Sequence, residues 1–84
     1  MSKVDELKQG LWAYLDGHSQ REVADQLGYS ESYLSFLRSG DRPVTEELCA
    51  RVIERIPSLG ILGYEARQEI TDERWRRMRA EAAR

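Results

Sequence analysis

Residues 19–40 constrain the fold of this chain more than any other stretch, because they specify two short helices and the turn between them. Ser19 is followed three residues later by a glutamate, the spacing of a capping box that satisfies two exposed amides at a helix start. Gly28 suits the left-handed conformation that ends a helix. Ser30 can then cap a second helix, which Gly40 ends.

The apolar residues of this stretch indicate how the two helices meet. Ala24 is small at the place where the helices should cross closely, and larger apolar residues recur at helical spacing on both sides of the turn. This is the physical specification of a helix-turn-helix, whose second helix lies in the major groove while the first crosses the DNA backbone. The larger apolar residues are Val23, Leu27, Leu34 and Leu37.

Helices also dominate the rest of the sequence. Ser2 is a helix start for a stripe of four apolar residues at spacings of three and four, and Thr45 opens another helix that Pro57 ends. We expect residues 58–64, which contain two glycines, to be irregular, and a last helix over about 71–83. The first stripe is Val4, Leu7, Leu11 and Leu15, and that of the helix after Thr45 is Leu48, Val52 and Ile56.

The helix-turn-helix stretch resembles that of the phage repressor and Cro type. The resemblance covers about Leu15 to Ile56 and is carried by the Ser-Gln opening, Val23-Ala24, Leu27-Gly28 and a Ser-x-x-Tyr-Leu-Ser run. It implies an all-α fold, a compact four- to five-helix lambda-repressor-like bundle with an additional C-terminal helix. We therefore divide the chain into a DNA-binding domain, 1–57, and a C-terminal extension, 58–84.

The outward face of the second helix supplies the candidate DNA contacts. At 100° per residue, Ser32, Phe36 and Ser39 lie opposite the leucines. Hydroxyls can donate to or accept from base edges, and an aromatic edge can contact a thymine methyl. The resemblance implies base contacts in the first turn of this helix, a phosphate-binding and buttressing role for Gln20, and a backbone contact for Arg42. The predicted DNA-binding residues are Gln20, Arg21, Ser30, Glu31, Ser32, Tyr33, Ser35, Phe36, Ser39 and Arg42.

Several of these residues have an alternative explanation. Glu31 can favour the helix N-terminus electrostatically instead of accepting from cytosine. Phe36 can cover an edge of the core or contact a partner protein, and Gln20 can be a solvated residue near the cap. Arg38 lies near the core side of the helix and is expected to form a surface ion pair.

Charge and composition exclude several function classes. The formal net charge of −2 is unlike that of a protein which binds DNA through bulk charge. The single cysteine and single histidine cannot form an internal disulfide or a zinc site, and no catalytic constellation is present, so we expect no enzyme activity, metal or cofactor. No apolar run is long enough to cross a membrane, and we expect a cytoplasmic protein that joins the nucleoid when it binds DNA.

The C-terminal extension is the candidate for self-association. The last helix either folds back on the core or contributes a dimer interface, and its arginines are a weaker candidate for phosphate contacts. The predicted dimer residues are Ile61, Leu62, Tyr64, Trp75 and Met78.

We therefore expect a sequence-specific regulator of transcription, a repressor that binds a short palindromic operator in double-stranded DNA as a homodimer. A phage Cro-like repressor, a controller of a restriction-modification operon and an autoregulating antitoxin fit equally, so a toxin or polymerase partner stays open. The alternative is a protein-interaction module that keeps the helix-turn-helix fold and has lost DNA binding.

Overall fold

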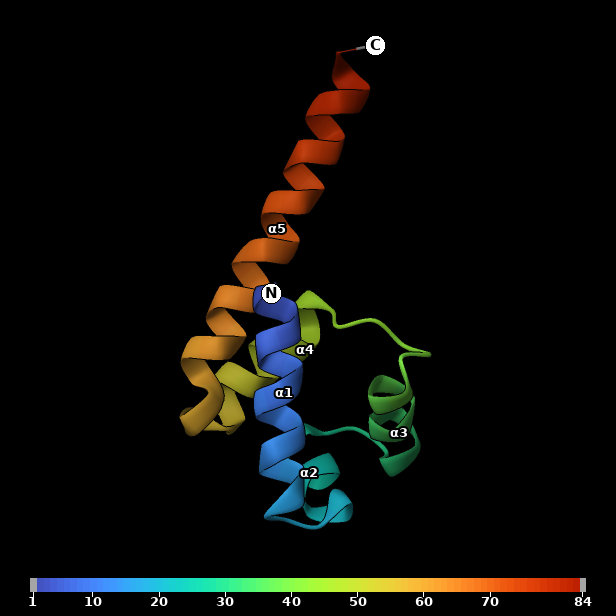
Figure 1. Cartoon of the computed structure of the whole chain (residues 1–84), viewed down its shortest axis with the longest axis vertical. Helices are drawn as coiled ribbons and strands as arrows, with labels where there is room; N and C mark the ends of the chain where they lie inside the picture. Colours follow the sequence, from blue (N-terminus) through green and yellow to red (C-terminus); the bar gives the residue numbers. More distant parts are fainter. Residues whose placement is uncertain (1, 84) are drawn as a thin grey trace.

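The computed structural model describes residues 2–83, and among them it contains only helices, turns and loops (Figure 1). This confirms the all-α class and the bundle with a helix-turn-helix and a C-terminal helix. The elements are α1 (Lys3–Asp16), α2 (Gln20–Leu27), α3 (Glu31–Ser39), α4 (Glu46–Arg55), a 3₁₀ turn η1 (Pro57–Leu59) and α5 (Gly60–Ala82).

The helix starts expected from the sequence are confirmed for the first four helices. In each case a hydroxyl at the N-cap accepts a hydrogen bond of 3.0–3.1 Å from the backbone amide three residues later. Gly28 and Gly40, with φ of 78° and 90°, end α2 and α3 in the left-handed region that glycine tolerates best. The four capping residues are Ser2, Ser19, Ser30 and Thr45.

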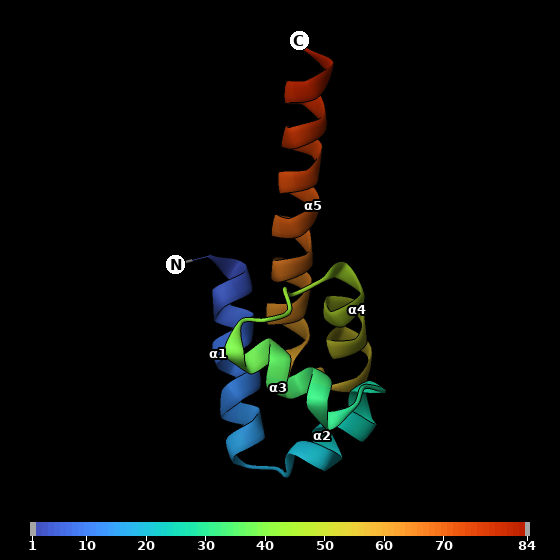
Figure 2. The ribbon, with the colours of Figure 1, turned by 90° about the vertical axis from the view of Figure 1, so that its right-hand side faces the viewer.

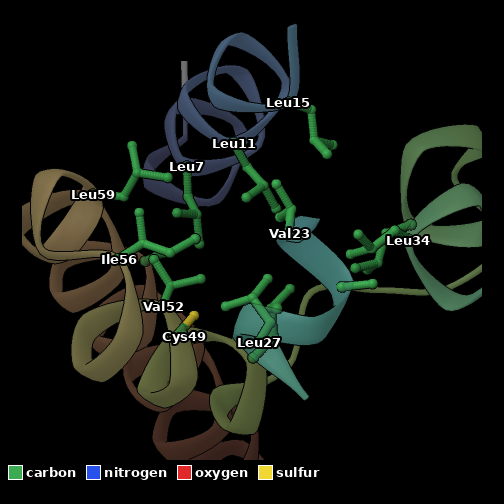
Figure 3. Packing of buried hydrophobic residues seen from close by; sticks show 14 residues of the cluster. Leu7, Leu11, Leu15, Val23, Leu27, Leu34, Cys49, Val52, Ile56 and Leu59 are labelled. Atoms are coloured by element: carbon green, nitrogen blue, oxygen red, sulfur yellow. The ribbon is translucent and has the colours of Figure 1, made fainter. Parts of the chain in front are cut away.

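A single apolar core joins all the helices (Figure 3). The four apolar stripes expected from the sequence converge on it, and Val23 and Leu27 of α2 lie between α1 on one side and α4 on the other. At about 25 cal/mol per Å² of apolar surface removed from water, each fully buried leucine contributes roughly 2 kcal/mol. The fully buried large residues are Leu7, Leu11, Val23, Leu27, Leu34, Leu37, Leu48, Cys49, Val52 and Ile56.

The C-terminal extension corrects the sequence-based expectation. Residues 58–64 are not irregular, because the last helix begins at Gly60 and not near residue 71. Glycine disfavours a helix by local propensity, but Gly63 is buried and allows close packing. A Cβ atom added there would lie 3.1 Å from Ile53 Cγ1 and 3.3 Å from the Cys49 carbonyl oxygen of α4. Glycine at this position therefore permits the contact between α4 and α5.

The two halves of α5 have different surroundings. Its first half packs on α1 and α4, where Ala66 is fully buried and Ile70 touches the core. Its second half extends away from the bundle (Figures 1 and 2), and every residue from 72 to 83 is exposed. No helix in the described part of the chain combines the length and apolar character that a membrane span needs.

Candidate nucleic-acid interface

Helix α3 is attached to the bundle along one edge only. Leu34 and Leu37 are 1% and 2% exposed and anchor it to the core. The helix lies at the surface on the side of the bundle away from α5 (Figures 1 and 2). Its other residues are therefore available to a ligand, except where the contacts described below engage them.

The outward face of α3 lies as expected from the helical spacing. Ser32, Ser35 and Ser39 are exposed, and Phe36 is 46% exposed and is not among the side chains packed against the core. Because a large apolar ring at the surface gains nothing from water, the exposure of Phe36 favours an intermolecular contact over a core-covering role.

Gln20 links the start of α2 to α3. Its side-chain amide donates to the Glu31 carbonyl oxygen at 2.9 Å and to Ser35 Oγ at 2.8 Å. These two bonds fix the first and second turns of α3 relative to α2 and leave Gln20 only half-buried. This geometry provides the buttress that the resemblance implies, and Ser35 belongs to it in addition to facing outward.

The turn between α2 and α3 is held by Arg51 of α4, a residue that the sequence reasoning missed. The Arg51 guanidinium donates to the carbonyl oxygens of Leu27 and Gly28 at 2.9 and 3.0 Å, and it pairs with Glu47 at 2.8 Å. It also lies over the Tyr29 ring, 4.5 Å from the centroid. The last carbonyls of a helix need donors, but the sequence does not indicate which cation reaches them across 23 residues.

Two tyrosines support the start of α3. The Tyr29 and Tyr33 rings stack with centroids 4.4 Å apart, and both side chains are partly buried against the core. Burial raises the pKa of Tyr29, and the nearby Arg51 charge opposes part of that shift. Tyr33 is thus a supporting residue with a partly exposed edge, and less available to DNA than its place on the helix flank suggested.

The two ends of α3 differ in what they can offer to DNA. The Ser30 hydroxyl is engaged as the N-cap of α3, accepting from the Tyr33 amide at 3.1 Å. At the other end, Ser39 Oγ lies 2.8 Å from Asp41 Oδ2 and 3.1 Å from the Phe36 carbonyl oxygen. Ser30 and Ser39 therefore have internal hydrogen bonds that a DNA contact would have to share or replace.

Charges around this face are mixed. Arg21 on α2 and Arg42 in the loop after α3 are exposed, and Glu31 is exposed in the first turn of α3. The ion pair expected for Arg38 is confirmed, because its guanidinium lies 3.7 Å from Asp16 Oδ1. The face therefore favours DNA through a few positioned groups and not through a broad positive field.

Cys49 and the acidic side chains form no second chemical site. Burial raises the pKa of the Cys49 thiol to about 11, so it stays protonated and unreactive. Among the described residues, no group of three or more potential ligands could hold a metal ion.

Two short helices at a fixed turn, with the second attached by two leucines and otherwise open to solvent, define the class of DNA-binding helix-turn-helix proteins. A family model described as helix-turn-helix matches residues 15–61, more than half of the chain. The chain belongs to this family of DNA-binding regulators, which confirms its resemblance to the repressor and Cro type. No curated protein and no solved structure matches it.

Proposed function

We propose that this protein is a sequence-specific repressor of transcription that places α3 in the major groove of a short operator. The observation that carries the proposal is the exposed Ser32–Phe36 face on a helix that Gln20 bonds to α2 and that follows a turn bonded by Arg51. Hydroxyl groups read base edges, and Phe36 contacts a thymine methyl. Arg21 and Arg42 contact phosphates and set the register, and Gln20 joins them by redirecting one of the two N–H groups that it donates to α3.

The protein acts by occluding polymerase, as a homodimer on a palindromic operator with half-sites about one DNA turn, roughly 34 Å, apart. We place it in the cytoplasm, associated with the nucleoid when bound to DNA. Genome neighbourhood distinguishes a phage repressor, a restriction-modification controller and an antitoxin.

The test is selection from a library of random duplexes at a fixed salt concentration. We expect enrichment of one short sequence, and no enrichment of any sequence would refute the proposal. Ser32→Ala and Phe36→Ala should each cost about 1–3 kcal/mol of binding to the selected site. Ser58→Ala, an exposed serine on η1, is the matched control and should leave binding unchanged.

The acidic balance favours one second candidate, a protein-interaction module that uses the α3 face for a protein. The net charge of −2 and the exposed Glu31 are the observations for it. A gel shift with mixed genomic DNA at low salt discriminates between the two, because the module would bind none of it.

A further inference from the structure

The outer face of α5 carries a heptad pattern. Starting at Ile61, every third and then fourth residue lies on one stripe, on the side of the helix away from the core contacts of Gly63 and Ala66. Four of its seven members are large side chains that are at least half exposed, from 50% for Met78 to 76% for Ile61. The stripe, here called the α5 stripe, is Ile61, Tyr64, Gln68, Thr71, Trp75, Met78 and Ala82.

One predicted dimer residue does not belong to the α5 stripe. Leu62 packs against the core, and its Cδ1 atom would lie 2.7 Å from a Cβ added at Gly10 of α1. The structure therefore removes Leu62 from the exposed surface, while Ile61, Tyr64, Trp75 and Met78 stay on it.

The end of α5 lacks packing within its own subunit. Residues 72–82 extend about 16 Å at 1.5 Å per residue, and all of them are exposed. An isolated helix of this length is marginal in water, and in proteins most helical stability comes from packing an apolar face. Trp75 and Met78 supply such a face without a partner in the subunit.

We propose that the α5 stripe pairs with the α5 stripe of a second copy in an antiparallel coiled coil. This proposal rests on the proposed function, whose homodimer it supplies with an interface. The chain is complementary to itself in this orientation, in both the sizes and the charges of its side chains.

Size complementarity comes from the antiparallel register. When residues whose numbers add to about 146 face each other, three of the four large stripe residues meet a smaller one, and Ile61 lies outside the paired segment. Tyr64 meets Ala82 of the second copy. Trp75 meets Thr71, which is half-buried and donates to Glu46 of its own subunit at 3.2 Å. Met78 meets Gln68, whose amide is bonded to the Tyr64 hydroxyl at 2.9 Å at the edge of the stripe.

Charge complementarity distinguishes antiparallel from parallel pairing. In the antiparallel register, Arg67 of each copy faces Glu81 of the other, and Glu65, which also pairs with Lys3 of its own subunit at 3.1 Å, faces Arg79. Like charges meet at two places, where Asp72 faces Asp72 of the second copy and Arg74 faces Arg74. Arg74 is already paired with Glu46 of its own subunit at 2.9 Å. A parallel pair would set Arg67 against Asp72 twice and Arg74 against Arg79 twice, so its attractive and repulsive pairs offset each other and it gains less.

We expect the pairing to leave the DNA-binding face uncovered, because α3 lies on the side of the bundle away from α5 (Figures 1 and 2). Each copy therefore keeps its Ser32–Phe36 face for DNA while α5 joins the two subunits.

The first test is sedimentation equilibrium of the full chain. We expect a dimer, and Trp75→Ala should weaken it about tenfold or more, because aromatic anchors dominate such contacts. Trp75 is 56% exposed, so this variant should keep the fold. A wild-type chain that stays monomeric at high concentration, with and without DNA, would overturn the proposal.

The second test addresses orientation through charge reversal. Glu81→Arg should weaken the dimer roughly three- to tenfold, because two attractive pairs become repulsive. Adding Arg67→Glu should restore it only in the antiparallel register. In a parallel pair, Arg67→Glu would place a carboxylate against Asp72, so failure of the double variant to recover would contradict the proposal.

The third test uses a short bismaleimide crosslinker. In the antiparallel register Asp72→Cys lies at the two-fold axis and should crosslink, whereas the two copies of Ala82→Cys lie about 27 Å apart and should not. Efficient crosslinking of Ala82→Cys would show a parallel pair and overturn the proposal. The buried Cys49 should not compete. Duplex selection remains the independent test of the proposed function, since a monomer can still enrich a sequence.

Discussion

Removing the guanidinium of Arg51 should destabilise the whole domain, because this group holds the turn of the helix-turn-helix. The Arg51 side chain is 31% exposed and makes two hydrogen bonds to carbonyls, an ion pair with Glu47 and a contact with the Tyr29 ring. The hydrogen bonds contribute about 1 kcal/mol each, and the exposed ion pair and the ring contact about 0.5 kcal/mol each. Arg51→Met should therefore cost about 2–3 kcal/mol of unfolding free energy.

The matched control is Arg55→Met, one turn later on the same helix. Arg55 is exposed, and its guanidinium makes a long 3.4 Å hydrogen bond to the Gln26 carbonyl oxygen, so its loss should cost less than about 0.5 kcal/mol. Urea unfolding followed by circular dichroism at 222 nm measures both. At an m-value of about 1 kcal/mol per M, the Arg51 midpoint should fall by about 2–3 M and the Arg55 midpoint by less than about 0.5 M. Equal shifts would refute the assignment of Arg51 as the residue that holds the turn.

Two further predictions concern Gln20 and Cys49. Gln20→Glu replaces a donor with a carboxylate that faces the Glu31 carbonyl oxygen, so operator affinity should fall about tenfold or more. Gln20→Ala should lower the affinity less. Equal losses of affinity in the two variants, measured by fluorescence anisotropy, would argue against the buttress. The folded pKa of Cys49, about 11, lies above its ordinary value of 9.0, so the unfolded state ionises first and stability should fall as the pH rises from about 9 to 11. Urea midpoints should decline less steeply over this range in Cys49→Ala, and parallel declines would contradict the predicted linkage.

The helix starts and the outward face of α3 could be predicted from the sequence because both depend on local chemistry. A capping hydroxyl such as Ser19 acts on an amide three residues away, and the spacing of Leu34 and Leu37 alone decides which side of α3 is buried. These features need no knowledge of how distant segments pack.

The start of α5 and the role of Arg51 could not be predicted for the opposite reason. By local propensity Gly63 weakens a helix, and only the position of α4 shows that the missing side chain permits close contact. Arg51 donates to carbonyls 23 and 24 residues away. From the sequence alone, other arginines of the chain are equally good candidates for these hydrogen bonds. Long-range geometry decided both cases.

Because the chain has a negative net charge, the internal contacts that order α3 are important for the proposed mechanism. A basic protein gains much of its DNA affinity from the release of counterions. Such a protein can bind DNA even if its recognition helix is mobile. With a net charge of −2, this chain must take more of its affinity from a few oriented contacts, and each contact loses free energy if α3 has to be ordered on binding. Gln20 and Arg51 order α3 beforehand. Pairing through α5 would then double the oriented contacts on one duplex without adding positive charge, because the second subunit binds at a high effective concentration.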